Sequence, residues 1–372
     1  MLARHALLRA AVSGTSAARG EDKRFEYKRR EPQASVLHKL VRENLEPFLQ
    51  YTREHYRKPL PKYVERELRG LLRCGDPWQG FTRVKCRRCR HEFFVALSCG
   101  ARTACPSCSA RRMAAASIHL CDRVLPETPV RQFVLSVPYE LRLLLASKSE
   151  VLSAVIRIVM RVVLGFYRKR GRELGLGKAE PGAVSFVQRS GGSLNSNTHL
   201  HIIVIDGVYS RDESSGAPRF HFVEPPSAAD LTQMVTTICE RVCKMLGRRG
   251  LLGEANHESN EADTTPDALA ACRKVSLSRG RFERLDERGR AQQQLFPDDE
   301  QGMRRKKDGR WTADFKGFSL NAGVSLSALD RRGRERLVRY CTLCRAQHKV
   351  HYAAHRIMPR MVPRYWIHRA VV

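Results

Sequence analysis

The segment from residue 195 to residue 207 constrains this chain most, because it reads as one buried strand with two histidines on a single face. It runs Asn-Ser-Asn-Thr-His-Leu-His-Ile-Ile-Val-Ile-Asp-Gly, a branched apolar run that ends at an Asp-Gly turn. Side chains of a strand alternate in direction, so His199 and His201 should project from one face while Leu200 is buried behind them. The fold must therefore bury this strand and keep both imidazoles on one side of a sheet.

These two histidines are candidate metal ligands. Two imidazoles one pleat apart can direct neutral nitrogen donors at a single divalent ion. The alternative is a pair of ordinary strand histidines, since a His-x-His pair is a weak motif by itself. Polar Asn195 and Asn197, a strongly basic chain and a tyrosine on a downstream helix favour the metal. A third ligand is needed, and Gln188 on the preceding strand is the first candidate, with Asn195 the second.

The charge of the chain favours a polyanionic partner. Lys and Arg total 67 against 38 Asp and Glu, which gives a formal net charge of +29 and a sequence pI of about 10.2. A surplus of this size favours nucleic acid over an anionic membrane surface.

Arg157 and Arg161 break the longest apolar stretch well below the ~18 residues of a membrane span, so no transmembrane helix is expected. With 372 residues, 42% of them hydrophobic, the chain can form about two domains with buried cores.

Five of the twelve cysteines crowd between residues 86 and 108, which favours metal in a reducing compartment over disulfides. Two Cys-x-x-Cys motifs, Cys86 with Cys89 and Cys105 with Cys108, have the spacing of a tetrahedral thiolate zinc site. We therefore predict structural zinc on these four thiolates, with a redox dithiol or unliganded cysteines as the alternative. Cys74, His91 and Cys99 lie nearby, and each could replace a ligand or support one.

Hydrophobic periodicity predicts an α+β chain. Acidic, polar residues 253–268 are expected to form a surface loop, and residues 279–310 an exposed insertion. Helices are expected over residues 35–57, 62–73, 141–145, 151–167, 231–246 and 328–341, and strands over 131–137, 183–189, 195–207, 208–210, 220–223 and 318–324.

Tyr340 is the candidate nucleophile. It ends a predicted helix that carries five arginines, and arginines can hold the phosphates of single-stranded DNA. Two metal-directed histidines together with a tyrosine phenol are what DNA nicking by tyrosine requires, because the metal polarises the phosphate while the phenol attacks it. The product is a 5′-phosphotyrosine and a free 3′-OH, and no nucleotide cofactor is needed. Tyr209 is a weaker candidate, because it follows the histidine strand too closely to be delivered on a separate helix.

Taken together, these motifs resemble the HUH tyrosine transposases of rolling-circle insertion sequences, which carry a transposase zinc-binding domain before the nicking domain. The resemblance covers roughly residues 31 to 340. It consists of Cys74-Gly75, Cys86-x-x-Cys89, Ser98-Cys99-Gly100, Cys105-Pro106-Ser107-Cys108 with Ala110-Arg111-Arg112-Met113, the run from Pro129 to Pro138, Val187-Gln188-Arg189, Leu194-Asn195, His199-Leu200-His201, Asp206-Gly207-Val208-Tyr209, Phe318-Ser319-Leu320 and Arg339-Tyr340.

This resemblance implies transposition through single-stranded DNA, with Mg²⁺ or Mn²⁺ held by His199 and His201 and with Tyr340 as nucleophile. The implied fold is a helical, zinc-ribbon-like domain followed by an HUH domain, whose ferredoxin- or RRM-like palm has an antiparallel central sheet and flanking helices. Such a protein is expected in the bacterial cytoplasm, associated with the nucleoid. The arginines expected to contact DNA are Arg111, Arg112, Arg336 and Arg339.

We expect a basic flexible arm over residues 1–30, a zinc-binding, DNA-contacting domain over 31–125 and the HUH domain over 126–345, with a variable insertion at 253–310. Residues 346–372 are expected to be a divergent tail. Relatives continue past the tyrosine with an Arg-Pro-Pro-like segment and a further domain, whereas this chain continues with a His- and Arg-rich segment that does not resemble the family.

Two departures from the family leave alternatives open. Some relatives place a second tyrosine at the position of Arg336, so this chain resembles a single-tyrosine version. The divergent tail predicts a truncated or frameshifted copy, which could act only as a zinc-containing DNA-binding protein. A zinc-ribbon RNA-binding protein with incidental histidines is the third alternative.

Overall fold

The computed structural model describes residues 31–87, 89–101, 105–190, 196–212, 214–251, 267–278, 284–285, 291–292, 311–342 and 351–352. The predicted arm over 1–30 lies outside the described residues, as do most of the insertion over 253–310 and most of the tail over 346–372. The chain divides into two compact units, Met1–Ala110 and Arg111–Val372, and each is described by itself.

Two helices, α2 (Val36–His55) and α3 (Lys62–Arg73), pack together in the first unit, near the predicted bounds. Ser35 caps α2 by accepting a hydrogen bond from the backbone N–H of His38, which satisfies one donor of the open helix end. Arg69 on α3 donates to Glu46 on α2, so the pair is held by an exposed ionic contact as well as by buried leucines. A 3₁₀ turn, η1 (Pro32–Ala34), precedes α2.

A β-hairpin follows, made of β1 (Phe81–Lys85) and β2 (Glu92–Ala96), after the 3₁₀ turn η2 (Pro77–Gln79). Its base is tied to the end of α3, because the N–H of Gly75 donates to the carbonyl of Leu97 at 3.1 Å. Helix α4 (Pro106–Arg123), which the sequence analysis did not predict, begins in this unit and ends in the second. The division between the two units thus falls inside this helix.

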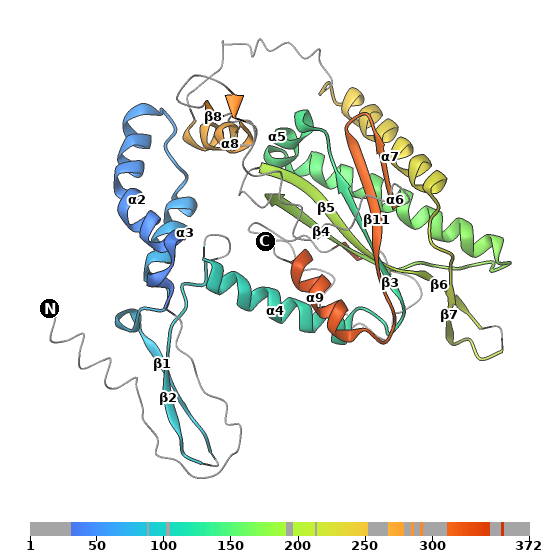
Figure 1. The fold of residues 1–372 in the computed structure, drawn as a ribbon, viewed down its shortest axis with the longest axis horizontal. Helices are drawn as coiled ribbons and strands as arrows, with labels where there is room; N and C mark the ends of the chain where they lie inside the picture. Colours follow the sequence, from blue (N-terminus) through green and yellow to red (C-terminus); the bar gives the residue numbers. More distant parts are fainter. Residues whose placement is uncertain are drawn as a thin grey trace. The chain divides into compact units, whose positions relative to one another are not determined.

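The second unit is built on a six-stranded antiparallel sheet with the order β10-β11-β3-β5-β4-β12. Figure 1 labels its four inner strands, β11, β3, β5 and β4. The histidine strand β5 lies inside this sheet, between β3 and β4. The strands are β3 (Val130–Ser136), β4 (Ala183–Ser190), β5 (Ser196–Ile205), β10 (Thr312–Phe315), β11 (Phe318–Leu326) and β12 (His351–Tyr352). The α+β prediction is confirmed.

Helices cover both faces of this sheet (Figure 1). On one face, α5 (Tyr139–Ser147), α6 (Ser149–Glu173) and α7 (Ala228–Arg248) bury the larger core, which includes Leu200 and Ile202 of β5. The smaller core on the other face packs residues of α4 and of α9 (Arg331–Cys341) against the sheet, including Ile203 of β5. Because strand residues alternate, His199 and His201 share the face of Ile203. The sheet therefore directs both histidines toward the side where α9 packs.

The chain bends at Asp206, where β5 ends, although the two strands on either side of this bend do not pair with each other. β6 (Gly207–Arg211) starts directly at Gly207 and pairs with β7 (Pro218–Phe222) in a separate two-stranded sheet. A Cβ at position 207 would lie 2.3 Å from the carbonyl oxygen of His221, so the glycine is required by close backbone approach. Helix α8 (Ala268–Ser278) and the short strands β8 (Arg284–Leu285) and β9 (Ala291–Gln292) complete the described elements.

None of the described helices is both long enough and apolar enough to cross a membrane.

Candidate active site and zinc cluster

Strands β4 and β5 place Gln188 beside His199. The two residues are directly paired in the antiparallel register, and His201 lies one pleat further along β5. All three side chains are buried, with exposed fractions of 8%, 7% and 2%. The histidine rings stand edge to face, with centroids 4.9 Å apart. The structure therefore brings the two predicted histidines and the first candidate for a third ligand together on one sheet face, whereas Asn195 lies outside the described residues.

The contacts of His199 leave two lone pairs facing each other. Its Nδ1 lies 2.8 Å from the carbonyl oxygen of Asn197, which can only accept, so Nδ1 carries the proton. In the neutral ring, Nε2 then presents a lone pair at 3.0 Å from Oε1 of Gln188. The amide nitrogen of Gln188 cannot turn toward the ring without losing its bond to the carbonyl oxygen of Tyr340, at 2.9 Å. Two acceptors at this distance require a positive charge between them, either a proton or a bound cation.

The ring of His201 offers a second nitrogen to the same site. Its Nε2 is buried and has no hydrogen-bond partner among the described residues, while Nδ1 contacts the Gln132 side chain at 2.7 Å. Burial, together with the charge of His199, lowers the pKa of His201 to about 3. The ring is therefore neutral near pH 7, which is the state that a metal ligand needs. The site thus fits a divalent cation on chemical grounds.

Helix α9 brings Tyr340 to the histidines. The centroids of the Tyr340 and His201 rings are 5.4 Å apart in an edge-to-face arrangement. Tyr340 is 52% exposed, whereas the histidines are buried, so the phenol lies at the solvent side of the cluster. Gln188, through its bond to the Tyr340 carbonyl, links the end of α9 to β4.

The position of α9 is set by contacts along its length. Asp330 caps its start by accepting from the N–H of Gly333 at 2.7 Å. From α4, Ser117 donates to the carbonyl of Glu335 at 2.8 Å, and Asp122 pairs with Arg331 at 2.7 Å. Val338 is fully buried in the smaller core. These contacts hold Tyr340 over β5, although the tyrosine and the histidines are far apart in the sequence.

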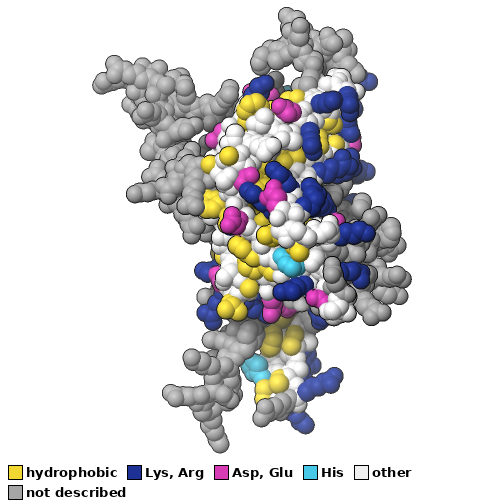
Figure 2. Space-filling model, turned by 90° about the vertical axis from the view of Figure 1, so that its right-hand side faces the viewer, with side chains coloured by type: hydrophobic (Ala, Val, Ile, Leu, Met, Phe, Trp, Pro, Cys, Tyr) yellow, Lys and Arg dark blue, Asp and Glu magenta, His cyan; other side chains and the backbone are white. Residues whose placement is uncertain are grey.

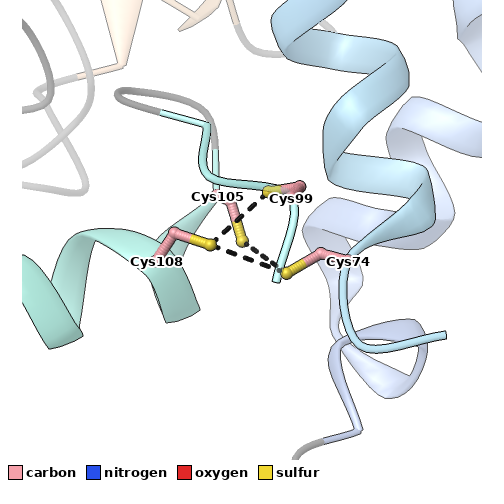
Figure 3. Close-up of side chains that lie close together, drawn as sticks. All are labelled: Cys74, Cys99, Cys105 and Cys108. Atoms are coloured by element: carbon pink, nitrogen blue, oxygen red, sulfur yellow. Dashed lines mark hydrogen bonds between the residues drawn. The ribbon is translucent and has the colours of Figure 1, made fainter. Parts of the chain in front are cut away.

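Four cysteine sulfurs meet in the first unit: those of Cys74, Cys99, Cys105 and Cys108 (Figure 3). All lie within 4.8 Å of one another, and three of the separations are 3.7, 3.5 and 3.4 Å. A tetrahedral zinc site with Zn–S distances of about 2.3 Å has sulfur separations of about 3.8 Å, so this cluster has the dimensions of such a site. Burial raises the pKa of Cys105 to about 11. At Cys108 the effect of burial is outweighed by hydrogen bonds from the other three thiols, which lower its pKa.

This cluster differs from the predicted ligand set in two members, because Cys86 and Cys89 are exposed and do not belong to it. The physical reason is the hairpin. Antiparallel pairing of β1 and β2 joins the segments before and after the hairpin at its base, where Cys74 and Cys99 lie. Cys86 and Cys89 lie beyond the opposite end of these five-residue strands, which are about 17 Å long. Cys74 and Cys99, at the base, are two of the three residues that the sequence predicts as possible replacement ligands. His91, the third of them, is exposed next to Cys89.

Comparison with known protein families gives two matches that cover most of the chain. The family described as "Transposase zinc-binding domain", of the IS91 type, matches residues 44–137. The family described as "Putative transposase" matches residues 182–359. The chain belongs to the IS91 family of transposases. Searches of curated proteins and of solved structures found no match to this transposase.

The family matches add two facts about the transposase. The zinc-binding match includes the four-cysteine cluster, so the protein contains structural zinc. The second match includes Gln188, both histidines and Tyr340, and it extends to residue 359, into the segment that the sequence analysis expected to be divergent. Among the described residues of α9, Tyr340 is the one tyrosine, and Arg336 occupies the position four residues before it.

The predicted DNA-contacting arginines of the transposase are exposed. Arg111 and Arg112 lie on α4, and Arg336 and Arg339 lie on α9. Figure 2 shows Lys and Arg side chains gathered along one edge of the face in view. Arg334 is another arginine of α9, but it is only 5% exposed and donates to the carbonyl oxygen of Pro126 at 2.9 Å. It therefore anchors α9 and is not available to DNA.

The transposase contains a buried ionic network that was not predicted from the sequence. The guanidinium of Arg131 on β3 donates through both Nε and an Nη nitrogen to Asp206, and Tyr167 on α6 donates to the same carboxylate at 2.8 Å. Burial and the negative charge of Asp206 raise the pKa of Tyr167, so its phenol stays protonated. The signal available in the sequence was an arginine inside a strand that is otherwise almost apolar.

Proposed function

We propose that this transposase nicks and rejoins single-stranded DNA through a covalent bond between Tyr340 and a 5′-phosphate. The observation that carries the proposal is the meeting of the neighbouring strands β4 and β5 with helix α9, which is far from both in the sequence. The ring of Tyr340 lies 5.4 Å from that of His201, and Gln188 contacts both His199 and the Tyr340 carbonyl. A buried histidine pair beneath a half-exposed phenol is the arrangement that tyrosine nicking requires.

His199, His201 and Gln188 would hold the Mg²⁺ or Mn²⁺ ion of this reaction. When bound, the ion supplies electrostatic stabilisation of the charge that develops on the scissile phosphate. The proposal is supported by the facing acceptors on His199 and Gln188, which a cation would satisfy, and by the buried Nε2 of His201, which has no hydrogen-bond partner among the described residues.

In the proposed step, Oη of Tyr340 attacks the phosphorus atom. The Oη–P bond forms as the P–O3′ bond breaks, the phenolic proton passes to water, and the leaving 3′ oxygen takes up a proton. The phosphodiester energy is conserved in the phosphotyrosine, so a free 3′-OH can later reverse the step at a new site. The reaction therefore needs no nucleotide cofactor.

The single-stranded ends of the element and its target are the proposed substrates. Arg336 and Arg339 are exposed on the helix that carries Tyr340, where they could hold phosphates on either side of the scissile one. Arg111 and Arg112 on α4 would add phosphate contacts.

We also propose that Cys74, Cys99, Cys105 and Cys108 are the ligands of the structural zinc. The sulfur separations and the burial of the cluster support this set over the one predicted from spacing. Cys105 and Cys108 lie at the start of α4, so zinc would fix the first turn of that helix.

The test of the nicking function is a covalent-adduct assay with a labelled single-stranded transposon end and Mn²⁺. Tyr340→Phe removes only the attacking oxygen, so this variant should bind DNA and form no adduct. His199→Ala and His201→Ala should each reduce adduct formation by about 10²-fold or more and leave DNA binding largely intact. Tyr209→Phe, the matched control, should react like the parent.

An adduct that persists in Tyr340→Phe would show that another residue is the nucleophile. If no variant reacts, the parent included, while DNA is still bound, the chain is a zinc-containing DNA-binding protein without nicking activity.

A further inference from the structure

Gln132 is a buried polar residue of β3 for which the proposed reaction has no role so far. It is 4% exposed and lies on the same sheet face as the histidines, next to β5 in the register. Its carboxamide nitrogen is 2.7 Å from Nδ1 of His201 and 3.4 Å from Sγ of Cys341. It thus contacts one histidine of the site and the residue that follows Tyr340.

The orientation of this carboxamide decides which nitrogen of His201 carries the proton. With the amide nitrogen toward the ring, Nδ1 accepts a hydrogen bond, and the proton of the neutral ring is on Nε2. That Nε2 is buried, and the described residues offer it no acceptor. With the carboxamide turned by half a revolution, Oε1 accepts a hydrogen bond from Nδ1–H, and Nε2 presents a lone pair. Only the second arrangement lets Nε2 bind a metal ion.

Cys341 makes both orientations possible. A thiol is a weak acceptor and a weak donor, so Sγ can accept from the amide nitrogen or donate to the amide oxygen. The contact with Cys341 is therefore kept when the carboxamide turns. A hydroxyl could do the same, but an apolar side chain at this position would satisfy neither orientation.

We propose that Gln132 is a positioning residue that fixes the proton of His201 on Nδ1 when a divalent ion binds, by turning its carboxamide oxygen toward the ring. This inference rests on the proposed function, since it assumes that His201 binds the ion. Partners of this kind orient ligand histidines, and their loss typically weakens metal affinity about 10- to 100-fold.

The test uses zinc-replete, full-length protein labelled with ¹⁵N in histidine. NMR distinguishes a protonated ring nitrogen from one with a lone pair, and the His201 signals are those lost in His201→Ala. Addition of Mg²⁺ to the parent should move the His201 proton from Nε2 to Nδ1. Mn²⁺ affinity, measured by electron paramagnetic resonance, should fall about 10- to 100-fold in Gln132→Leu and stay unchanged in Gln233→Leu, an exposed control on α7.

Gln132→Glu separates this role from simple packing. A carboxylate accepts from Nδ1–H in either orientation, so His201 should carry its proton on Nδ1 even without a divalent ion, and Mn²⁺ should bind at least as tightly as to the parent. Thermal melts establish that each variant is folded. Unchanged Mn²⁺ affinity in Gln132→Leu, or an Nε2-protonated ring in metal-free Gln132→Glu, would overturn the inference alone. A parent whose His201 signals do not respond to Mg²⁺ would overturn the proposed metal site together with the inference.

Discussion

Gln188 has two separate contacts, one through each end of its carboxamide. Oε1 faces Nε2 of His199 at 3.0 Å, and the amide nitrogen donates to the carbonyl oxygen of Tyr340 at 2.9 Å. The same nitrogen lies 3.5 Å from the carbonyl oxygen of Cys341. In the proposed site, a glutamine therefore combines an oxygen that would bind the metal with a donor that holds the end of the tyrosine helix. A carboxylate could supply only the first of these functions.

Gln188→Glu is expected to separate metal binding from nicking. The carboxylate can still bind a divalent ion, but its second oxygen would face the Tyr340 carbonyl without a proton to share. An unsatisfied contact of this kind costs about 1–3 kcal/mol, which would shift the tyrosine helix. Mn²⁺ affinity should be retained, while the single-turnover rate of adduct formation falls about tenfold. A rate equal to that of the parent would show that the Gln188–Tyr340 contact is unimportant for nicking.

At the level of elements, the β1–β2 hairpin decides which cysteines meet. Its paired strands bring the segments before and after it together at the base, and the bond between Gly75 and Leu97 closes this base. Arg90 at the other end has a φ of 57°, a left-handed conformation that a tight turn between Cys86 and β2 requires. Cys86 and Cys89 thus lie at the turn of the hairpin, apart from the buried cluster of four sulfurs.

Two matched serine substitutions test this arrangement. Cys99→Ser should lose the structural zinc and unfold the first unit, because zinc binding and folding are coupled at such sites. Cys89→Ser changes a cysteine of the Cys-x-x-Cys motif that lies outside the cluster. This variant should retain about one zinc per chain and the parent's melting temperature. Zinc content measured by elemental analysis, with circular dichroism as the control for folding, distinguishes the two. Loss of zinc in Cys89→Ser with retention in Cys99→Ser would restore the ligand set predicted from spacing.

On the scale of the whole molecule, the net charge of +29 should make DNA binding strongly dependent on salt. For single-stranded DNA the logarithm of the affinity falls with the logarithm of the salt concentration by about 0.7 for each phosphate neutralised. Replacing both Arg336 and Arg339 by Gln should therefore reduce the slope by about 1.4. Arg219→Gln, an exposed arginine on β7, serves as the control and should leave the slope unchanged. Fluorescence anisotropy over a salt series measures the slope for the parent, the double variant and the control. An unaltered slope in the double variant would show that α9 is not part of the DNA-binding surface.

The sequence by itself determined the local features of this transposase. Alternation in the segment 195–207 placed both histidines on one strand face with Leu200 on the other, and helical periodicity placed Tyr340 at the end of a helix. These predictions succeed because strand and helix periods depend only on neighbouring residues. The family followed from the motifs in the same way, since each motif is a short run.

Only the tertiary structure decided which of these residues come together. Gln188 faces His199 because of the register between β4 and β5, and Tyr340 reaches His201 because α9 packs on the sheet against α4. Spacing alone grouped Cys86 and Cys89 with Cys105 and Cys108, whereas the hairpin brings Cys74 and Cys99 to the sulfurs of Cys105 and Cys108. The physical reason is that register and packing depend on contacts between different segments of the chain, whereas periodicity describes only the residues within one segment.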